Sequence, residues 1–293
     1  MNAPSTIATG TVVDARNLRK HYKNKLALDG TNFQIPTGRI IGLIGPNGAG
    51  KTTALKAMLG LIPFEGELSV LGRDPRTQRD DLMSDVCFIA DVAVLPRWIK
   101  VKEAIEFVAG VHPRFDRAKC ERFLAHTQLK PELRVRELSK GMIVQLHLAL
   151  VMAIDAKLLV LDEPTLGLDI LYRKEFYESL LNDYFDHEKT ILVTTHQIEE
   201  IERILTDLMF IKDGRIILDA SMEAVGDRYA EVLVAPDKAD AARALKPLSE
   251  RQIFGKSVFL FDGADQAHLS TLGELHKPSV ADLFVATMKG TYA

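Results

Sequence analysis

The sequence is poor in cysteine and lacks a long apolar run. Only two of its 293 residues are cysteines, Cys87 and Cys120, so a disulfide-stapled scaffold is excluded and a reducing compartment is favoured. A membrane-spanning helix needs about 20 nearly uninterrupted apolar residues. The most apolar stretch, residues 143–161, is interrupted by Gln145, His147, Asp155 and Lys157. Any membrane span is therefore expected to come from another chain.

The chain also lacks an excess of charge of one sign. Its 37 Lys and Arg against 40 Asp and Glu leave a net charge of −3, without the overall basic charge typical of nucleic-acid binders, so no nucleic-acid partner is expected. The first ten residues contain no basic segment followed by an apolar run, so residues 1–10 are expected to be a flexible lead-in and not a secretory signal. With 47% hydrophobic and 26% charged residues, the composition is typical of a globular protein.

Strands separated by helices dominate the middle of the chain and indicate a parallel sheet with helical crossovers. The expected strands are Thr11–Leu18, Thr31–Ile35, Arg39–Ile44, 64–72, Lys157–Leu161 and Thr190–Thr195. The expected helices are Ala54–Leu61, Val101–Val111, Arg117–Gln128, Tyr172–Tyr184, 197–205 and a helix capped by Ser139. Asp213-Gly214, between Leu208–Lys212 and Arg215–Asp219, is a strong hairpin signal.

The pattern restarts after about residue 220. Strands are expected at Glu231–Ala235 and Ser257–Phe261, with helices near 237–246 and 279–289. We therefore predict a main domain over residues 11–220, with a helical subdomain at about 92–140, and a small α+β accessory domain over residues 221–293.

A glycine-rich loop between an expected strand and an expected helix matches the phosphate-binding pattern G-x-x-x-x-G-K-[ST] in its required context. Its residues are Gly45, Pro46, Asn47, Gly48, Ala49, Gly50, Lys51 and Thr52. The glycines let backbone N–H groups wrap a phosphate, and the following helix presents its positive N-terminal end. Lys51 supplies a charge for the β- and γ-phosphates, and the Thr52 hydroxyl can ligate Mg²⁺. The alternative is a glycine-rich turn that matches by chance and binds nothing.

An apolar strand ending in two carboxylates completes this pattern. Leu158 to Leu161 lead into Asp162 and Glu163. In P-loop proteins such a strand places an aspartate beside Mg²⁺, which makes Asp162 the metal candidate. Glu163 would then face the γ-phosphate, where it could orient or deprotonate water. The alternative is an acidic turn at a strand end.

Further motifs resemble one P-loop family. Leu138-Ser139-Lys140-Gly141-Met142 is similar to the LSGGQ signature of ABC ATPases, and Thr165-Leu166-Gly167-Leu168-Asp169 is similar to their D-loop. His196 follows an apolar strand as the family's switch histidine does, and Tyr22 precedes the phosphate loop where the family places an adenine-stacking aromatic. The resemblance covers roughly residues 11–220. The motif sequences and the C-terminal appendage resemble those of ATPases of ABC-2-type exporters.

The resemblance implies an α/β fold, a P-loop NTPase of the ABC ATPase type. It would have a parallel core sheet, an antiparallel β subdomain, a helical subdomain and a small C-terminal α+β appendage. Two copies would pair head to tail around two ATP molecules. Lys51, Thr52 and Thr53 of one copy would hold phosphates and metal, while Ser139 and Gly141 of the other close over the γ-phosphate.

Three more roles follow from the resemblance. Glu163 is implied as the general base, His196 as the γ-phosphate sensor, and Asp169 as a connection between the two sites. The sequence departs from the family pattern where Lys140 and Met142 replace a glycine and a glutamine of the signature. Asp91 stands where the family usually has glutamine. Its short carboxylate could reach Mg²⁺ only through water or a loop shift.

The leading hypothesis is an ATP-hydrolysing subunit that energises a separate integral-membrane permease, for export, from the cytoplasmic face of the membrane. A homodimer is expected over pairing with a paralogue. The alternative is an ABC-type ATPase acting in DNA repair or translation, but neither a long heptad insertion nor a second cassette is present. A P-loop GTPase or kinase would leave the signature unexplained.

Trp98 and Ile99 allow two interpretations. They are either partner-facing anchors or part of the core of the helical region. Glu199, Glu200 and Glu202 are expected to form a solvated helix face.

Overall fold

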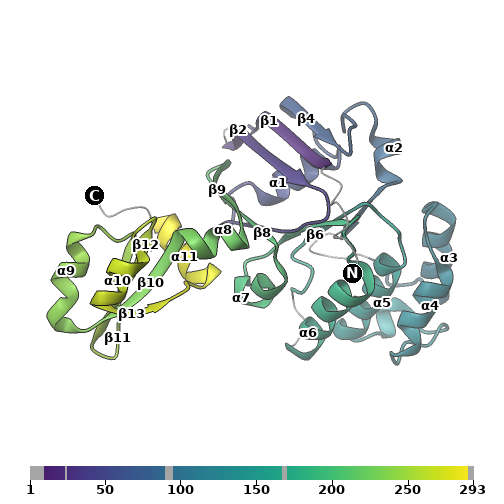
Figure 1. Ribbon diagram of the computed structural model, residues 1–293. Coiled ribbons are helices and arrows are strands. Elements are labelled where there is room, and N and C mark those ends of the chain that lie inside the picture. The colour runs from purple at the N-terminus through teal and green to yellow at the C-terminus, as the bar shows by residue number, and fades with distance from the viewer. Residues whose placement is uncertain (1–9, 24, 90–94, 167–169, 290–293) are drawn as a thin grey trace, which may run out of the picture.

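The computed structural model describes residues 10–23, 25–89, 95–166 and 170–289. Its centre is a six-stranded sheet of order β5-β6-β7-β3-β8-β9 (Figure 1). The strands are β3 (Ile40–Ile44), β5 (Val86–Ile89), β6 (Leu158–Asp162), β7 (Thr190–Thr194), β8 (Asp207–Lys212) and β9 (Arg215–Ser221). The first five are parallel, and β9 closes the edge antiparallel to β8. The predicted parallel core sheet is confirmed.

The central strands are apolar because both faces of the sheet are covered. Every residue of β3, β6 and β7 is buried, as is usual for parallel strands packed between layers. The predicted hairpin between β8 and β9 is also present, and Asp213 and Gly214 both have positive φ, at 48° and 74°. A two-residue turn of this kind matches the right-handed twist of the flanking strands.

A three-stranded antiparallel sheet of order β2-β1-β4 packs above the core sheet (Figure 1). Its strands β1 (Thr11–Tyr22) and β2 (Lys25–Pro36) are each longer than the sequence pattern predicts, and β4 spans Glu65–Val70. Helix α1 (Lys51–Met58) lies between the two sheets, and its Ala54, Leu55 and Met58 share one apolar cluster with strands of both. The helix thus starts three residues earlier than predicted, directly after the glycine-rich loop.

The helical region consists of α3 (Val101–Val111), α4 (Arg117–Ala125), a 3-10 turn (Val135–Glu137) and α5 (Lys140–Met152). The short helix α2 (Arg79–Met83) precedes β5, and its Leu82 belongs to the same apolar cluster as α1. Helices α3, α4 and α5 bury an apolar cluster of their own, which includes Ile105, Cys120 and Leu146. Ile99 packs against this cluster, whereas Trp98 is 69% exposed. Core packing is therefore the wrong interpretation for Trp98 within this chain.

A buried carboxylate joins the helical region to both sheets. Asp85, directly before β5, is 4% exposed in its side chain and forms ion pairs with Arg73 at 2.9 Å and Arg114 at 2.7 Å, and with Lys157 at 3.7 Å. Arg73 follows β4, Arg114 lies between α3 and α4, and Lys157 precedes β6. Burial raises the pKa of Asp85, but the three cations outweigh burial and lower it below its ordinary value of 3.8.

Two predicted helices are shorter than the sequence pattern suggests. Helix α6 (Ile170–Ser179) passes into a π-helical turn (Leu180–Tyr184), and α7 (Ile198–Ile201) passes into a 3-10 turn (Glu202–Ile204). The tighter turn after α7 brings Leu205 against β3, where a Cβ on Gly42 would lie 2.7 Å from Leu205 Cδ1.

A second antiparallel sheet, the C-terminal sheet, has the order β11-β12-β10-β13 (Figure 1, left). Its strands are β10 (Tyr229–Val234), β11 (Ser249–Ile253), β12 (Lys256–Asp262) and β13 (Gly273–His276). Helix α8 (Met222–Arg228) leads into this sheet, and α9 (Ala239–Ala244) and α10 (Gln266–Leu272) pack on it around an apolar cluster that includes Val232, Phe259 and Leu269. Helix α11 (Val280–Lys289) follows β13 and returns to the core sheet.

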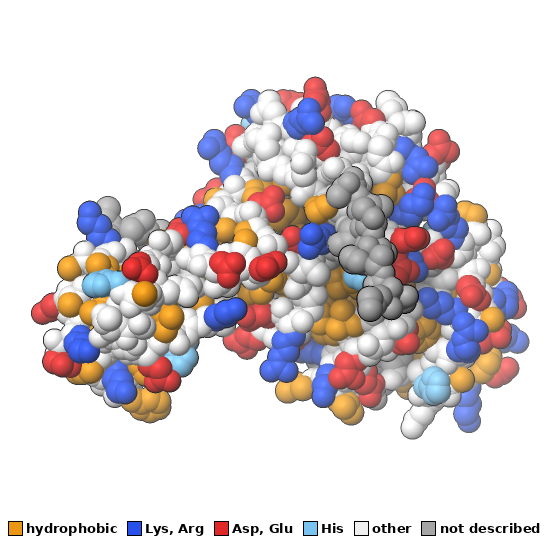
Figure 2. All heavy atoms as spheres, in the orientation of Figure 1, with side chains coloured by type: hydrophobic (Ala, Val, Ile, Leu, Met, Phe, Trp, Pro, Cys, Tyr) orange, Lys and Arg blue, Asp and Glu red, His pale blue; other side chains and the backbone are white. Residues whose placement is uncertain are grey.

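The surface matches the balanced charge of the sequence. On the face shown in Figure 2, acidic and basic side chains alternate, and no large area carries one sign. None of the helices in the described ranges is sufficiently long and apolar to span a lipid bilayer.

Candidate nucleotide site

The glycine-rich loop is shaped by close backbone approaches. It joins the end of β3 to the start of α1, as predicted. Gly50 has φ 115°, and a Cβ there would lie 2.5 Å from the carbonyl oxygen of Ala27. A Cβ on Gly45 would lie 2.4 Å from the carbonyl oxygen of Ile211. Only glycine fits these two positions, because any side chain would push β2 or β8 away from the loop.

Lys51 is directed into the loop that precedes it. It is 7% exposed, and its Nζ donates hydrogen bonds to the carbonyl oxygens of Gly45 at 2.6 Å and Pro46 at 3.4 Å. Burial lowers the pKa of Lys51, while the nearby carboxylates of Glu163 and Asp162 oppose that shift. The ammonium group therefore occupies the inside of the loop, with backbone carbonyls as its partners.

Thr52 and Asp162 meet although they are far apart in the sequence. Thr52 Oγ1 donates to Asp162 Oδ2 at 3.1 Å, and the hydroxyl of Thr194 donates to Asp162 Oδ1. Asp162 ends β6 and is 5% exposed, and Thr194 ends the adjacent strand β7. A hydroxyl beside a buried carboxylate provides oxygen ligands of the kind that Mg²⁺ prefers together with phosphate oxygens.

Glu163 and His196 form a second pair at the same edge of the sheet. Oε2 of Glu163 lies 2.8 Å from Nδ1 of His196 and accepts from its backbone N–H at 3.3 Å. Glu163 adopts φ 51°, an uncommon conformation for a side chain of this kind. Such backbone strain concentrates at functional sites.

One cavity of about 320 Å³ joins the glycine-rich loop to Asp162 and Glu163. Its lining includes Pro46, Asn47, Gly48, Gly50, Lys51, Thr52, Thr53, Asp162, Glu163 and Tyr22. Tyr22 ends β1 and is 43% exposed, and Lys20 Nζ lies 5.1 Å from the centre of its ring. The structure thus places Tyr22 in the lining of the same cavity as the phosphate loop, although 22 residues separate it from Gly45.

Lys25 also lines this cavity, and the sequence analysis missed it. Its Nζ would lie 2.9 Å from a Cβ built on Gly48. The only signal in the sequence is a basic cluster around Tyr22, formed by Lys20, Lys23 and Lys25. No known motif includes that cluster. Only the folded arrangement therefore shows that the Lys25 ammonium group lies against the loop at Gly48.

Within the described residues, the signature residues Ser139 and Gly141 lie outside the lining of the cavity around Lys51. Ser139 caps α5 as predicted, and its Oγ accepts from the backbone N–H of Met142 at 3.2 Å. Gly141 lines a separate groove of about 760 Å³ between α4, α5 and α6. Asp91 and Asp169 fall outside the described residues.

The expectation of a solvated glutamate face after His196 is wrong for two of its three members. Glu199 is exposed, but Glu200 pairs with Arg173 of α6. Glu202 Oε1 accepts from the backbone N–H of Val280, at the start of α11, at 3.1 Å. These contacts join elements far apart in the sequence, which is why the local pattern of charges did not reveal them.

Comparisons with known proteins agree with this geometry. Residues 28–166 match the family model described as ABC transporter. The chain is 34% identical to the Nod factor export ATP-binding protein I of Burkholderia thailandensis, over 93% of this chain and 95% of that protein. It is 29% identical to the Sinorhizobium fredii protein of the same name, over 97% and 88% of the two chains.

Solved structures share the fold. An ATP-binding subunit of an ABC transporter superposes with a TM-score of 0.65 at 24% identity, over 74% of this chain and 92% of that one. A nucleotide-free ATP-binding cassette gives 0.64 at 18% identity, over 74% and 94%. ATPase domains of this kind bind ATP and work with membrane permease components. The chain belongs to the ABC transporter family, as an ATP-hydrolysing subunit of a transporter.

Proposed function

We propose that this chain binds ATP with Mg²⁺ in the cavity around Lys51, hydrolyses it with Glu163 as general base, and drives export through a separate permease. The observation that carries the proposal is the meeting of Lys51, Thr52, Asp162 and Glu163 in one cavity at the end of parallel strands. Open α/β sheets bind their ligands at this edge.

The phosphates and the metal are assigned to the loop and to the end of β6. Lys51 exchanges its bonds with the carbonyls of Gly45 and Pro46 for phosphate oxygens, and Thr53 adds a second hydroxyl beside Thr52. The Thr52–Asp162 pair is assigned to Mg²⁺. Asp91, outside the described residues, is a further candidate contact through water or after a loop shift. When bound, Mg²⁺ supplies charge neutralisation at the phosphates.

Water activation is assigned to the second pair. Glu163 would accept the proton of the attacking water, because it borders the cavity and follows the metal-binding aspartate directly. His196 would orient the Glu163 carboxylate and sense the γ-phosphate. Tyr22 is assigned to stacking on adenine, and its ring already has the Lys20 ammonium 5.1 Å from its centre.

We infer that a second copy of this chain completes the site. The N-terminus of α5, capped by Ser139, is a suitable anion site, yet it is not part of the cavity around its own Lys51. A head-to-tail homodimer would bring Ser139 and Gly141 of one copy to the γ-phosphate of the other. Asp169 is assigned to the connection between the two sites.

The names of the relatives support the proposed transport direction. Proteins named Nod factor export ATP-binding protein I favour export over the alternative role in repair or translation. We place the chain on the cytoplasmic face of the membrane, with Trp98 as an apolar anchor for the permease. Residues 11–220 would be the ATPase domain and residues 221–293 an accessory domain. Co-purification of a polytopic membrane protein is expected, whereas nucleic acid or ribosomes in the eluate would favour the alternative.

A heterodimer carrying two different lesions tests the composite site. One chain carries Ser139→Arg and the other Lys51→Ala, and two different affinity tags isolate the mixed dimer. If Ser139 acts on the partner's nucleotide, one site combines an intact Lys51 with an intact Ser139 and the other carries both lesions. The mixed dimer should then regain part of the ATPase activity that each homodimeric variant lacks.

The matched control carries the same two lesions on a single chain, paired with a wild-type chain. In the composite-site arrangement each of its sites has one lesion, so this dimer should be nearly inactive. If Ser139 acted within its own chain, the control dimer would keep one intact site and be active. Each site of the test dimer would then carry one lesion, and that dimer would be inactive. An active control together with an inactive test dimer would overturn the composite site.

A further inference from the structure

Helix α11 packs against the helix that follows His196. Leu283 and Ala286 of α11 are buried in one apolar cluster together with Ile198 and Ile201 of α7. The backbone N–H of Val280 donates to Glu202 Oε1 at 3.1 Å, directly after α7. Helix α11 therefore supports α7, which begins two residues after His196.

The other end of α11 is attached to the core sheet. Lys212, the last residue of β8, donates from Nζ to the carbonyl oxygen of Met288 at 2.8 Å. The Phe284 ring lies edge-on to the Phe210 ring of β8, with 5.3 Å between ring centres. Strand β8 pairs with β3, which leads into the phosphate loop. One helix is thus attached both to the switch segment and to a neighbour of the phosphate loop.

Phe284 also faces a second cavity, next to the one around Lys51. This cavity of about 390 Å³ is lined by Phe284 together with Gly45, Asn47, Glu163, His196 and Ile198. Phe284 is only partly buried, so part of its ring borders the hollow that the reactive side chains also border. A side chain that only filled the core would be enclosed by other apolar groups.

The C-terminal sheet holds α11 from the other side. Arg251 of β11 forms ion pairs with Asp282 of α11 at 3.2 Å and with Glu231 of β10 at 3.0 Å. A displacement of the C-terminal sheet would therefore act on α11, and through it on α7.

We propose that α11 is a positioning element for ATP hydrolysis, in which Phe284 and the Glu202–Val280 hydrogen bond hold α7, and with it His196, in the geometry needed for turnover. This inference rests on the role proposed above for His196. It gives the C-terminal part of the chain a function within the ATPase cycle, because α11 links the C-terminal sheet to the switch histidine.

The first test is steady-state ATP hydrolysis by the full-length chain carrying Phe284→Ala. A misplaced catalytic group lowers turnover more than ground-state binding, so kcat should fall about 10-fold while KM changes less than about twofold. Phe284→Leu should restore most of kcat, because leucine keeps apolar bulk at that position. Val285→Ala is the matched control, since Val285 is the next residue of α11 and is 48% exposed. It should leave kcat unchanged.

A double-mutant cycle separates positioning from general support of the fold. If Phe284 acts through His196, adding Phe284→Ala to His196→Ala should lower kcat no further. If the two losses multiply, Phe284 does not act through the histidine and the inference is overturned. Should His196→Ala alone leave kcat unchanged, the proposed role of His196 fails, and this inference fails with it. A loss with His196→Ala but none with Phe284→Ala overturns the inference alone.

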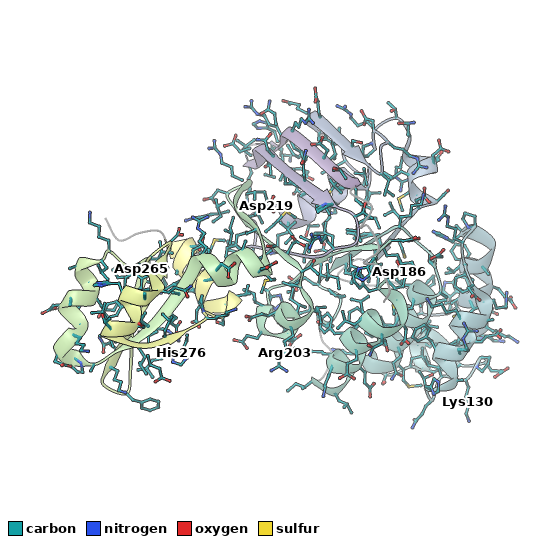
Figure 3. The ribbon with its side chains drawn as sticks, in the orientation of Figure 1. Lys130, Asp186, Arg203, Asp219, Asp265 and His276 are labelled. Carbon is teal, nitrogen blue, oxygen red and sulfur yellow. The ribbon has the colours of Figure 1, made fainter. Side chains whose placement is uncertain are left out.

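A second pair of variants covers the case in which Phe284→Ala does not fold. Glu202→Ala removes the acceptor of the Val280 N–H, and Arg203→Ala changes its exposed neighbour on the same turn, labelled in Figure 3. We expect Glu202→Ala to lower kcat with KM retained and Arg203→Ala to leave both unchanged. Equal effects of the two variants would contradict the proposal.

Discussion

Oε2 of Glu163 lies 2.8 Å from Nδ1 of His196 and accepts from the backbone N–H of the same residue at 3.3 Å. The carboxylate is 14% exposed and the imidazole 50%. His196 therefore holds one carboxylate oxygen of Glu163 from its more exposed side. If Glu163 is the base proposed above, this contact fixes the orientation of its carboxylate.

Glu163→Gln should preserve ATP binding and nearly abolish turnover, because it removes the proposed base while keeping the shape of the side chain. General-base catalysis contributes about 100-fold or more, so kcat should fall at least that far while the Kd for ATP stays close to wild type. Size-exclusion chromatography should detect a trapped ATP-bound dimer. Glu199→Gln, an exposed change on α7, is the control. Near-normal hydrolysis by Glu163→Gln would exclude Glu163 as the base.

Lys51→Ala should weaken ATP binding itself, since it removes the charge that we assign to a phosphate contact in the ground state. A hydrogen bond to a charged group is worth about 1.5–3 kcal/mol, so the Kd should rise roughly 10- to 100-fold. Lys56→Ala, an exposed change on the same helix, should have no effect. A binding titration in which both variants match the wild type would contradict the assignment of Lys51.

Tyr22→Ala should weaken ATP and GTP binding by similar factors, because the face of the ring does not read base edges. Stacking on a base contributes about 1–3 kcal/mol. Tyr22→Phe and Tyr22→Trp should be mild. Fluorescence titrations with both nucleotides measure the effect. Unchanged ATP affinity in Tyr22→Ala would contradict the assignment of Tyr22 to adenine stacking.

Asp85→Asn should destabilise the fold by about 1–3 kcal/mol, because Arg73 and Arg114 would lose a buried charged partner. Chemical denaturation measures the free energy of unfolding. The pKa of this carboxyl is lower in the folded state than in the unfolded one, so its contribution is complete above the unfolded pKa. The free energy of unfolding of the wild type should therefore approach that of Asp85→Asn below about pH 4, as pH falls toward the folded pKa. A difference that widens on acidification would contradict the sign of this shift.

Much of the core fold and the phosphate site could be predicted from local pattern. The loop from Gly45 to Thr52, the Ser139 cap and the Asp213-Gly214 turn each depend on a few consecutive residues whose conformation glycine, serine or aspartate determines. The buried strands β3, β6 and β7 are recognisable because their apolar runs are only five residues long, which favours a buried strand over a buried helix.

What could not be predicted depends on residues far apart in the chain. β11 and β13 carry mostly polar, exposed side chains, so hydrophobic periodicity gave no signal for either strand. In the sequence Phe284 is one of several apolar residues on an expected helix. Only the folded structure shows that it lines the same cavity as His196. Lys25, Asp85 and Glu202 likewise look like surface charges until their partners from other elements are known.

The turn at Gly214 has a consequence for the time at which this protein becomes able to bind nucleotide. Its backbone N–H donates to the carbonyl of Ala49 at 2.9 Å, and its own carbonyl accepts from the N–H of Asp29 at 3.0 Å and from the Thr31 hydroxyl. A growing chain leaves the ribosome amino terminus first. The segment that holds the phosphate, although made early, gains these contacts only after β8, β9 and the turn between them have emerged. A nascent chain that stops before Gly214 therefore lacks a contact that shapes its ATP site.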